Sequence, residues 1–338
     1  MKHEIYILHG GLLSTIQDRG RFGFMKVGVS PAGAMDLFSL SIANLLVGNN
    51  LGEAVLETMY AGVQIEFGCD ETIAITGASS AAYINESEVP LWQSLEVKKG
   101  DVLHIKSPST GIFNYIAFSR GIAIPKIMGS KSTHLRSGIG GWKGRAIQAG
   151  DAIPLGEKMK SSPDLMLRKE KRPVYTKEKT LRVVLGPQDD HFTEEGVQTF
   201  LRSPYTITAQ SDRMGYRLEG PPITHKTSAD VISDGSAHGS IQVPGSAQPI
   251  VLLSDRGTTG GYAKIATLIA EDICTLSQMT PGSTVFFTTV TEQEANRLFR
   301  QFITETEKSL TSIRDPKQKQ LVITVAGKEY SIKIKKLD

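Results

Sequence analysis

One stretch of the chain combines the acidic, hydroxyl and glycine residues that an anion-binding or acyl-transfer site needs. The apolar residues 250–253 are typical of a short buried strand, and the polar run 254–262 would sit at its end. Glycine lets backbone amides approach a ligand closely, because it carries no Cβ atom. Asp255, Thr258 and Thr259 together with these amides would suit a carboxylate or a carboxyphosphate. The same residues also fit a hairpin whose Asp and Thr side chains cap the turn, and both interpretations stay open.

A second cluster, residues 211–217, carries one carboxylate and two guanidinium groups. If this segment is a strand, Arg213 and Arg217 point to the same face, since alternate side chains do. Two such forks would hold a carboxylate through paired hydrogen bonds. The alternative is an internal network in which Asp212 and the arginines fix a loop.

Residues 17–21 and Asp36 form a third mixed cluster, in which Asp18 and Arg19 are neighbours. The alternative here is a paired surface network, which usually contributes little to stability. Residues 129–134 carry three hydroxyls and Lys131 but lack the glycine spacing of a P-loop, so no nucleotide site is predicted there. The histidines show no metal-ligand spacing, and no Gly-x-Ser-x-Gly turn indicates a serine hydrolase.

Short apolar, β-branched segments must position these clusters. Gly, Pro, Asn or Asp residues separate these apolar segments from one another, and this pattern is typical of a mainly β protein of sandwich or barrel type. Apolar residues at helical spacing predict four helices, the first of which has Asp36 as its N-cap. The predicted helices cover residues 37–47, 194–201, 265–276 and 292–306.

Residues 157–180 are rich in Lys, Ser, Pro and Glu and have little periodicity, which indicates a connection between two domains. The end of the chain alternates apolar and polar residues on both sides of a turn, which predicts a β-hairpin within residues 320–336. The predicted organisation is a first domain at 1–156, a linker at 157–180, a second domain at 181–307 and a tail at 308–338.

Composition and charge limit the classes of protein. The chain has 338 residues, 40% hydrophobic and 22% charged, with a formal net charge of +3. This is a globular composition, and the dispersed basic residues do not indicate nucleic acid binding. No apolar run approaches a membrane span and no secretion signal is visible, so we expect a cytoplasmic protein without a membrane anchor. Residues 157–160 resemble a biotin attachment sequence only superficially, and Lys160 is expected to be unmodified.

Taken in order, the clusters resemble one known family. The segments that carry the resemblance are 17–21, 33–36, 43–44, 129–133, 211–217, 241–245 and 258–262. This ordered set is similar to the KipA family, also known as the C subunit of 5-oxoprolinase or as allophanate hydrolase subunit 2, which forms part of the carboxyltransferase region of urea carboxylases. The chain departs from the usual pattern at Lys131, where the family has arginine, and at Gly257, where it has glutamine.

The resemblance implies two tandem cyclophilin-like β-barrels that work within a larger complex. The implied partners are the KipI-like B subunit of 5-oxoprolinase and its LamB/YcsF-like A subunit, which together open 5-oxoproline to L-glutamate with ATP. The sequence shows neither an ATP-grasp region nor a biotinyl domain, so ATP would be shared with the complex and biotin is not expected on this chain. Two alternatives stay open. One is a regulatory protein that binds a KipI-like inhibitor of a sporulation histidine kinase, and the other is a carboxyltransferase that uses carboxybiotin and a urea-like amide.

The residues lead to the hypothesis of a polar, solvent-filled groove between the two domains. An arginine fork would bind the carboxylate of 5-oxoproline, and an aspartate would orient water or accept its proton. The candidate catalytic residues are Asp255, Asp212 and Asp18. The candidate substrate-binding residues are Arg213, Arg217, Arg19, Asp36, Gln242, Thr258, Thr259 and Tyr262. No metal ion is predicted in the site.

Overall fold

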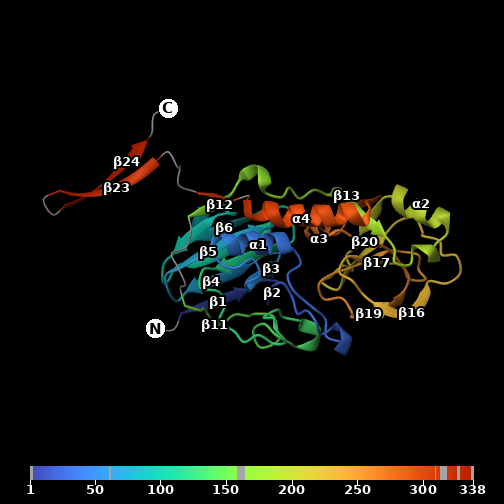
Figure 1. The fold of residues 1–338 in the computed structure, drawn as a ribbon. Coiled ribbons are helices and arrows are strands. Elements are labelled where there is room, and N and C mark those ends of the chain that lie inside the picture. The colour runs from blue at the N-terminus through green and yellow to red at the C-terminus, as the bar shows by residue number, and fades with distance from the viewer. Residues whose placement is uncertain are drawn as a thin grey trace.

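The computed structural model describes residues 3–60, 62–157, 164–308, 310–312, 318–325 and 328–335. Two β-rich lobes lie side by side, and three of the α-helices gather along one side of their junction (Figure 1). The predicted mainly β fold is therefore confirmed. The expectation for Lys160 falls outside the described residues. The α-helices are α1 (Leu37–Leu46), α2 (Glu194–Arg202), α3 (Ala270–Ser277) and α4 (Glu292–Lys308).

The first lobe is built from two antiparallel sheets, with strand orders β11-β1-β4-β9-β6-β7 and β2-β3-β10-β5-β8. In β4 the residues Val63, Ile65 and Phe67 are buried and alternate with less buried ones, as expected for a strand with one face in the core. Buried Ile, Leu, Val and Phe side chains from both sheets form one cluster between them. The strands are β1 (Glu4–Gly10), β2 (Leu13–Gln17), β3 (Val55–Met59), β4 (Val63–Phe67), β5 (Glu71–Gly77), β6 (Ser80–Ile84), β7 (Ser87–Val89), β8 (Ser94–Val97), β9 (Val102–Pro108), β10 (Phe113–Phe118) and β11 (Ala152–Pro154).

The second lobe contains a closed barrel of seven strands in the order β13-β20-β17-β18-β15-β14-β21. Strand β13 pairs in parallel with β21 and antiparallel with β20. Strands β16 and β19 form a separate two-stranded sheet. The strands of this lobe are β13 (Glu178–Leu185), β14 (Tyr205–Ile207), β15 (Gly215–Glu219), β16 (Asp230–Gly235), β17 (Ser240–Gln242), β18 (Ile250–Leu252), β19 (Thr259–Tyr262), β20 (Lys264–Leu268) and β21 (Thr284–Thr289).

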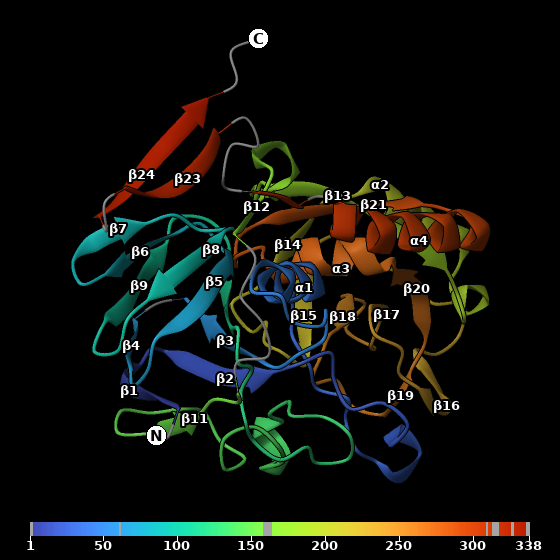
Figure 2. The same ribbon diagram turned by 60° about the vertical axis from the view of Figure 1, so that its left-hand side comes forward.

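Helix α1 lies at the junction of the two lobes. Its N-cap is Asp36, as predicted, whose carboxylate accepts hydrogen bonds from Ser39 N at 3.0 Å and Ser39 Oγ at 2.6 Å. The helix packs on β5 and β10 of the first lobe and also meets α3 and α4 (Figure 2). A second apolar cluster runs from α1 into the barrel interior, so the two lobes share one continuous core.

The predicted helix over residues 265–276 is wrong in its first part. Lys264–Leu268 form β20, which pairs with both β13 and β17, and α3 begins only at Ala270. The apolar spacing of this segment fits a helix, but pairing on both edges closes the barrel and satisfies the backbone. Long-range pairing therefore overrides the local period.

The connecting segment and the start of the tail lie side by side, because β12 (Leu165–Leu167) pairs antiparallel with β22 (Leu310–Ser312). The predicted hairpin is confirmed as β23 (Gln318–Val325) paired with β24 (Lys328–Lys335). Figure 1 shows this hairpin at the end of the molecule formed by the first lobe. The predicted domain boundaries remain predictions.

One ion pair in the first lobe gives a testable pH dependence. Arg145 donates to both oxygens of Asp151, at 2.7 and 2.6 Å, and lowers the pKa of that carboxyl to about 2. Because the folded pKa lies below the unfolded value near ~3.9, this stabilisation is present above that value and is lost as the pH falls towards 2. We expect Arg145→Met to cost about 1–2 kcal/mol at pH 6 in urea unfolding, and much less near pH 2.

The matched control is Lys98→Met, which removes a pair with Asp70 whose two side chains are 70% and 61% exposed. That change should cost much less than Arg145→Met at pH 6, because solvent screens an exposed pair. An Arg145→Met deficit that does not shrink with acid would contradict the assignment to Asp151.

Candidate functional site

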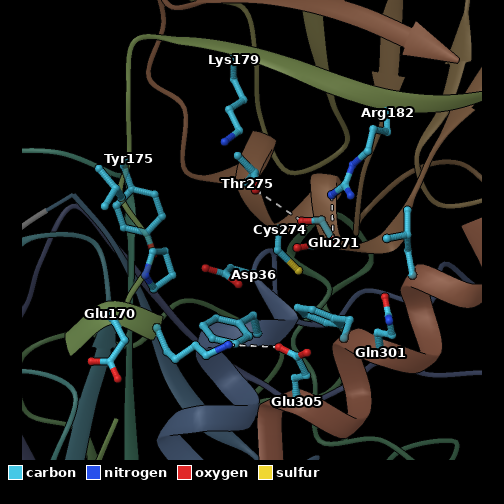
Figure 3. A pocket seen from close by; sticks show the side chains of 16 residues that line it. Asp36, Glu170, Tyr175, Lys179, Arg182, Glu271, Cys274, Thr275, Gln301 and Glu305 are labelled. Carbon is cyan, nitrogen blue, oxygen red and sulfur yellow. Dashed lines mark hydrogen bonds and ion pairs between the residues drawn. The ribbon is translucent and has the colours of Figure 1, made fainter. Parts of the chain in front are cut away.

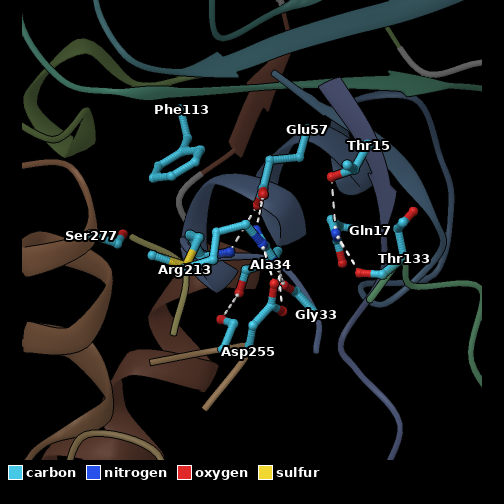
Figure 4. Close-up of polar contacts among 12 residues, drawn as sticks. Thr15, Gln17, Gly33, Ala34, Glu57, Phe113, Thr133, Arg213, Asp255 and Ser277 are labelled. Atoms are coloured by element: carbon cyan, nitrogen blue, oxygen red, sulfur yellow. Dashed lines mark hydrogen bonds and ion pairs between the residues drawn. The ribbon is translucent and has the colours of Figure 1, made fainter. Parts of the chain in front are cut away.

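A buried ionic cluster joins the two lobes at Arg213 (Figure 4). Its Nε and Nη2 atoms donate to the two oxygens of Asp255, at 2.9 and 3.1 Å. Nη2 also donates to the carbonyl of Gly33 at 2.6 Å, and Nη1 donates to Glu57. Gly33 and Glu57 belong to the first lobe, whereas Arg213 and Asp255 belong to the second. The guanidinium is therefore the ionic link between the lobes.

The backbone holds both carboxylates in place. Asp255 follows β18, and its N–H donates to Arg213 O at 2.9 Å. Glu57 stands in the middle of β3, where its second oxygen accepts from Met35 N at 2.8 Å. Neighbouring Ser254 donates its hydroxyl to Ala34 O across the junction at 2.9 Å. The loop before α1 is thus fixed from both sides.

The cluster is closed to solvent, with exposed fractions of 2% for Glu57, 7% for Arg213 and 8% for Asp255. The closed cluster differs from the predicted solvent-filled groove. The Arg213 guanidinium donates its hydrogen bonds to two carboxylates and a carbonyl of its own chain instead of facing solvent. Burial raises the pKa of Glu57, and the charge of Arg213 acts against that rise. Burial alone would lower the pKa of Arg213, but the charges of Asp255 and Glu57 outweigh it and raise that pKa.

Gln278, at the C-cap of α3, is a second link between the lobes. Its Oε1 accepts from Ile112 N at 2.8 Å and Phe113 N at 2.9 Å. Its Nε2 donates to Phe113 O and to Asp36 Oδ2, both at 3.0 Å. Every hydrogen-bonding position of this buried amide is used, and all partners lie in the first lobe.

Asp36 connects the two links. Its backbone N–H donates to Tyr115 Oη at 2.8 Å, and the Tyr115 hydroxyl hydrogen-bonds Glu57. Its carboxyl accepts from Gln278 as well as from Ser39, and burial raises its pKa. In the structure Asp36 caps α1 and ties Gln278 to the ionic cluster, and its predicted contact with substrate remains a prediction.

Asp18 organises the loop around residues 130–132. Its carboxylate accepts from the hydroxyls of Ser130 at 2.6 Å and Ser132 at 2.5 Å, and from Lys131 N at 2.7 Å. The Lys131 ammonium is paired with Glu53 at 2.6 Å. These bonds occupy Asp18 within the first lobe.

Arg21 is a buried neighbour of this loop and of the cluster. Its Nε donates to Ile127 O at 3.1 Å and its Nη2 to Ser132 O at 2.7 Å, whereas Nη1 has no partner within the described residues. Burial lowers its pKa, and the charges of Asp18 and Asp255 oppose that shift. Arg21 is thus placed electrostatically between two of the predicted acids.

The structure does not bring the remaining predicted residues into the cluster. Asp212 accepts from Met214 N and Gly215 N at 2.8 and 3.2 Å, so it caps its own turn, and Arg217 is exposed on β15.

Arg19 lines a separate cavity of about 540 Å³ with residues 49–53. Gln242 is buried on β17 with its Nε2 unpartnered in the described chain. The other members lie at or beside β19 (Thr258, Thr259 and Tyr262).

Glu57 and Gln278 are functional candidates that the sequence did not single out, and Arg21 lies in the predicted 17–21 cluster but was not named as a site residue. Glu57 did leave a signal, because an acid flanked by apolar residues in a strand must find a partner when it is buried.

In the described residues no group of three or more His, Cys, Asp or Glu side chains could hold a metal ion. No helix in that part of the chain is long and apolar enough to cross a membrane.

The chain shares its sequence pattern with known carboxyltransferase domains. The family model for the carboxyltransferase domain, subdomain A and B, matches residues 27–289. The chain is 38% identical to the C subunit of 5-oxoprolinase from Escherichia coli over 289 residues, which covers 86% of this chain and 92% of that protein.

Urea amidolyases are also similar. That of Saccharomyces cerevisiae is 30% identical over 308 residues, which cover 85% of this chain but only 17% of that much longer protein. The crystal structure of the K. lactis urea amidolyase superposes with a TM-score of 0.85 and 25% identity, covering 96% of this chain and 22% of that one. The chain belongs to the carboxyltransferase domain family, subdomains A and B, together with the C subunit of 5-oxoprolinase.

Proposed function

We propose that this chain is the C subunit of an ATP-dependent 5-oxoprolinase complex that opens 5-oxoproline to L-glutamate. The observation that carries the proposal is the extent of the similarity to the Escherichia coli protein, which spans 92% of that protein. The Glu57–Arg213–Asp255 cluster supports it, because it places acids and a cation from both lobes at one point. The partners are the KipI-like B subunit of the complex and its LamB/YcsF-like A subunit, and ATP is shared with them.

The lactam of 5-oxoproline is a poor electrophile. Phosphorylation of its oxygen makes C5 reactive towards water, the ring nitrogen leaves as an amine, and a second water hydrolyses the resulting acyl phosphate. Asp255 is our candidate for orienting water or accepting its proton, because it lies at the junction of the lobes, whereas Asp212 caps its own turn and Asp18 is held by the 130–132 loop. Because four of the five N–H donors of Arg213 bind groups of its own chain, we assign it to holding Asp255 and Glu57 rather than to the substrate carboxylate.

Reconstitution tests the proposal. The complete set of three subunits should release glutamate from 5-oxoproline and ATP, and omission of this chain should abolish that release. Equal glutamate release without the chain would end the enzymatic proposal and favour the regulatory one, in which the chain sequesters a KipI-like inhibitor.

A second candidate function is a carboxyltransferase reaction on a urea-like amide. The family description and the superposition on the urea amidolyase favour it. It predicts that a carboxybiotinylated carrier transfers CO2 to the amide in the presence of this chain. If the carboxybiotinylated carrier transfers no CO2 to the amide, the carboxyltransferase function is rejected and only the 5-oxoprolinase function remains.

A further inference from the structure

A cavity of about 460 Å³ opens at the junction of the lobes, beside Asp36 (Figure 3). This volume lies within the range of small-molecule pockets, roughly 300–1,000 Å³, and such pockets favour domain junctions. Helix α1, the segment before β13, β13 itself, α3 and α4 all contribute side chains to its wall. Of the candidate site residues named above, Asp36 alone lines it within the described part of the chain.

Among the charged residues that line the cavity, Lys179 and Glu170 have no ion pair within the described part of the chain. Lys171 pairs with Glu305 at 3.1 Å, and Arg182 pairs with Glu271 at 2.8 Å. Throughout the described chain, no carboxylate lies within ion-pair distance of Lys179. Figure 3 shows the Lys179 side chain pointing towards the cavity, which Thr275 of α3 also lines.

Aromatic rings supply the apolar wall. The rings of Phe38 and Phe302 pack with their centroids 5.7 Å apart, and Tyr175 lines the same cavity. Rings arranged in this way favour a flat apolar body that can stack or pack edge to face. The carboxyl of Asp36 is occupied by Ser39 and Gln278, so it does not call for a cationic ligand.

We propose that this cavity binds a small aromatic carboxylate, whose acid group pairs with Lys179 and whose ring packs against Phe38, Tyr175 and Phe302. The site is also an effector site, because Asp36 at the cavity is joined through Gln278 and Tyr115 to the Glu57–Arg213 cluster. This second part rests on the proposed function, and the binding part does not.

The binding test uses 4-fluorophenylacetate and ¹⁹F NMR on the full chain. Saturable binding is expected with Kd on the order of 1 mM or below. Lys179→Met should weaken it by at least about tenfold, and the neutral 4-fluorophenylacetamide should bind the wild type more weakly by a similar factor. Lys177→Met is the matched control and should change nothing, because Lys177 is exposed like Lys179 but does not line the cavity. Leu298→Arg, which fills the cavity from α4, should abolish binding.

Absence of saturable binding to the wild type, or equal binding to Lys179→Met, overturns the site. The effector part is tested on the reconstituted complex, where saturating 4-fluorophenylacetate should change glutamate release in the wild type and not in Lys179→Met. Unchanged release with retained binding overturns the effector role. A complex that releases no glutamate even without the probe counts against the proposed function, and the NMR result still decides the site.

Discussion

Replacement of Arg213 by methionine is expected to lower the free energy of unfolding by about 3–5 kcal/mol, because it leaves two buried carboxylates without their cation. Glu57 and Asp255 are 2% and 8% exposed, so water cannot take over the role of the guanidinium without opening the lobe junction. Methionine keeps much of the apolar volume, so the loss reports on charge and hydrogen bonds. Denaturant unfolding at pH 7 measures it, and glutamate release by the reconstituted complex should be lost as well.

Arg217→Met is the matched control for this prediction. Arg217 lies in the same sequence cluster but is exposed on β15, so its loss should cost less than about 0.5 kcal/mol. If the two substitutions have equal effects, the buried cluster does not hold the lobes together.

Local sequence signals predicted those parts of the fold whose stabilising groups are near in sequence. The start of α1 is set by Asp36 and Ser39, and the terminal hairpin by alternation on both sides of a turn. The barrel could not be predicted in this way, because its closure pairs β13 with β21 across roughly a hundred residues. The same distance explains the error at β20, where two remote neighbours decide between strand and helix.

The site was predictable in part for the same reason. Residue types alone indicated that Arg213 and Asp255 share a site, and they form an ion pair. Glu57 escaped notice because it is the only charged residue of β3 and its partner is 156 residues away. The sequence does not show how deeply Arg213 is buried. Only the folded structure shows that its guanidinium is hydrogen-bonded to groups of its own chain, whereas the sequence alone suggests a guanidinium that is free to bind a ligand.

Replacement of Gln278 by leucine should cost roughly 3–5 kcal/mol of unfolding free energy. The change leaves the buried N–H groups of Ile112 and Phe113 without their acceptor. It also removes one of two hydrogen bonds each from the Phe113 carbonyl, which keeps Ala78 N, and from Asp36 Oδ2, which keeps the Ser39 hydroxyl. Asp36 is connected to Glu57 by hydrogen bonds through Tyr115, so loss of the Gln278 contact should also disturb the ionic cluster. We therefore expect the variant to lower kcat for glutamate release more than it raises KM. Gln198→Leu, at an exposed position of α2, controls for the change of side chain and should leave both quantities within error.

Gln278→Glu distinguishes a positioning role of Gln278 from simple packing. The substitution keeps the shape of the side chain and replaces only its Nε2 donor with an oxygen. Glutamate still accepts from Ile112 N and Phe113 N, but the Nε2 position becomes an oxygen facing Asp36 Oδ2 and Phe113 O, which also accept. That oxygen must carry a proton, so the folded pKa of the new carboxyl rises above its unfolded value near ~4.3. Stability is then retained at low pH and lost as the pH rises through the folded pKa. Unfolding at pH 5 and pH 8 should show the deficit growing with pH, and a deficit independent of pH would mean that the hydrogen bond from Gln278 to Asp36 does not hold the junction.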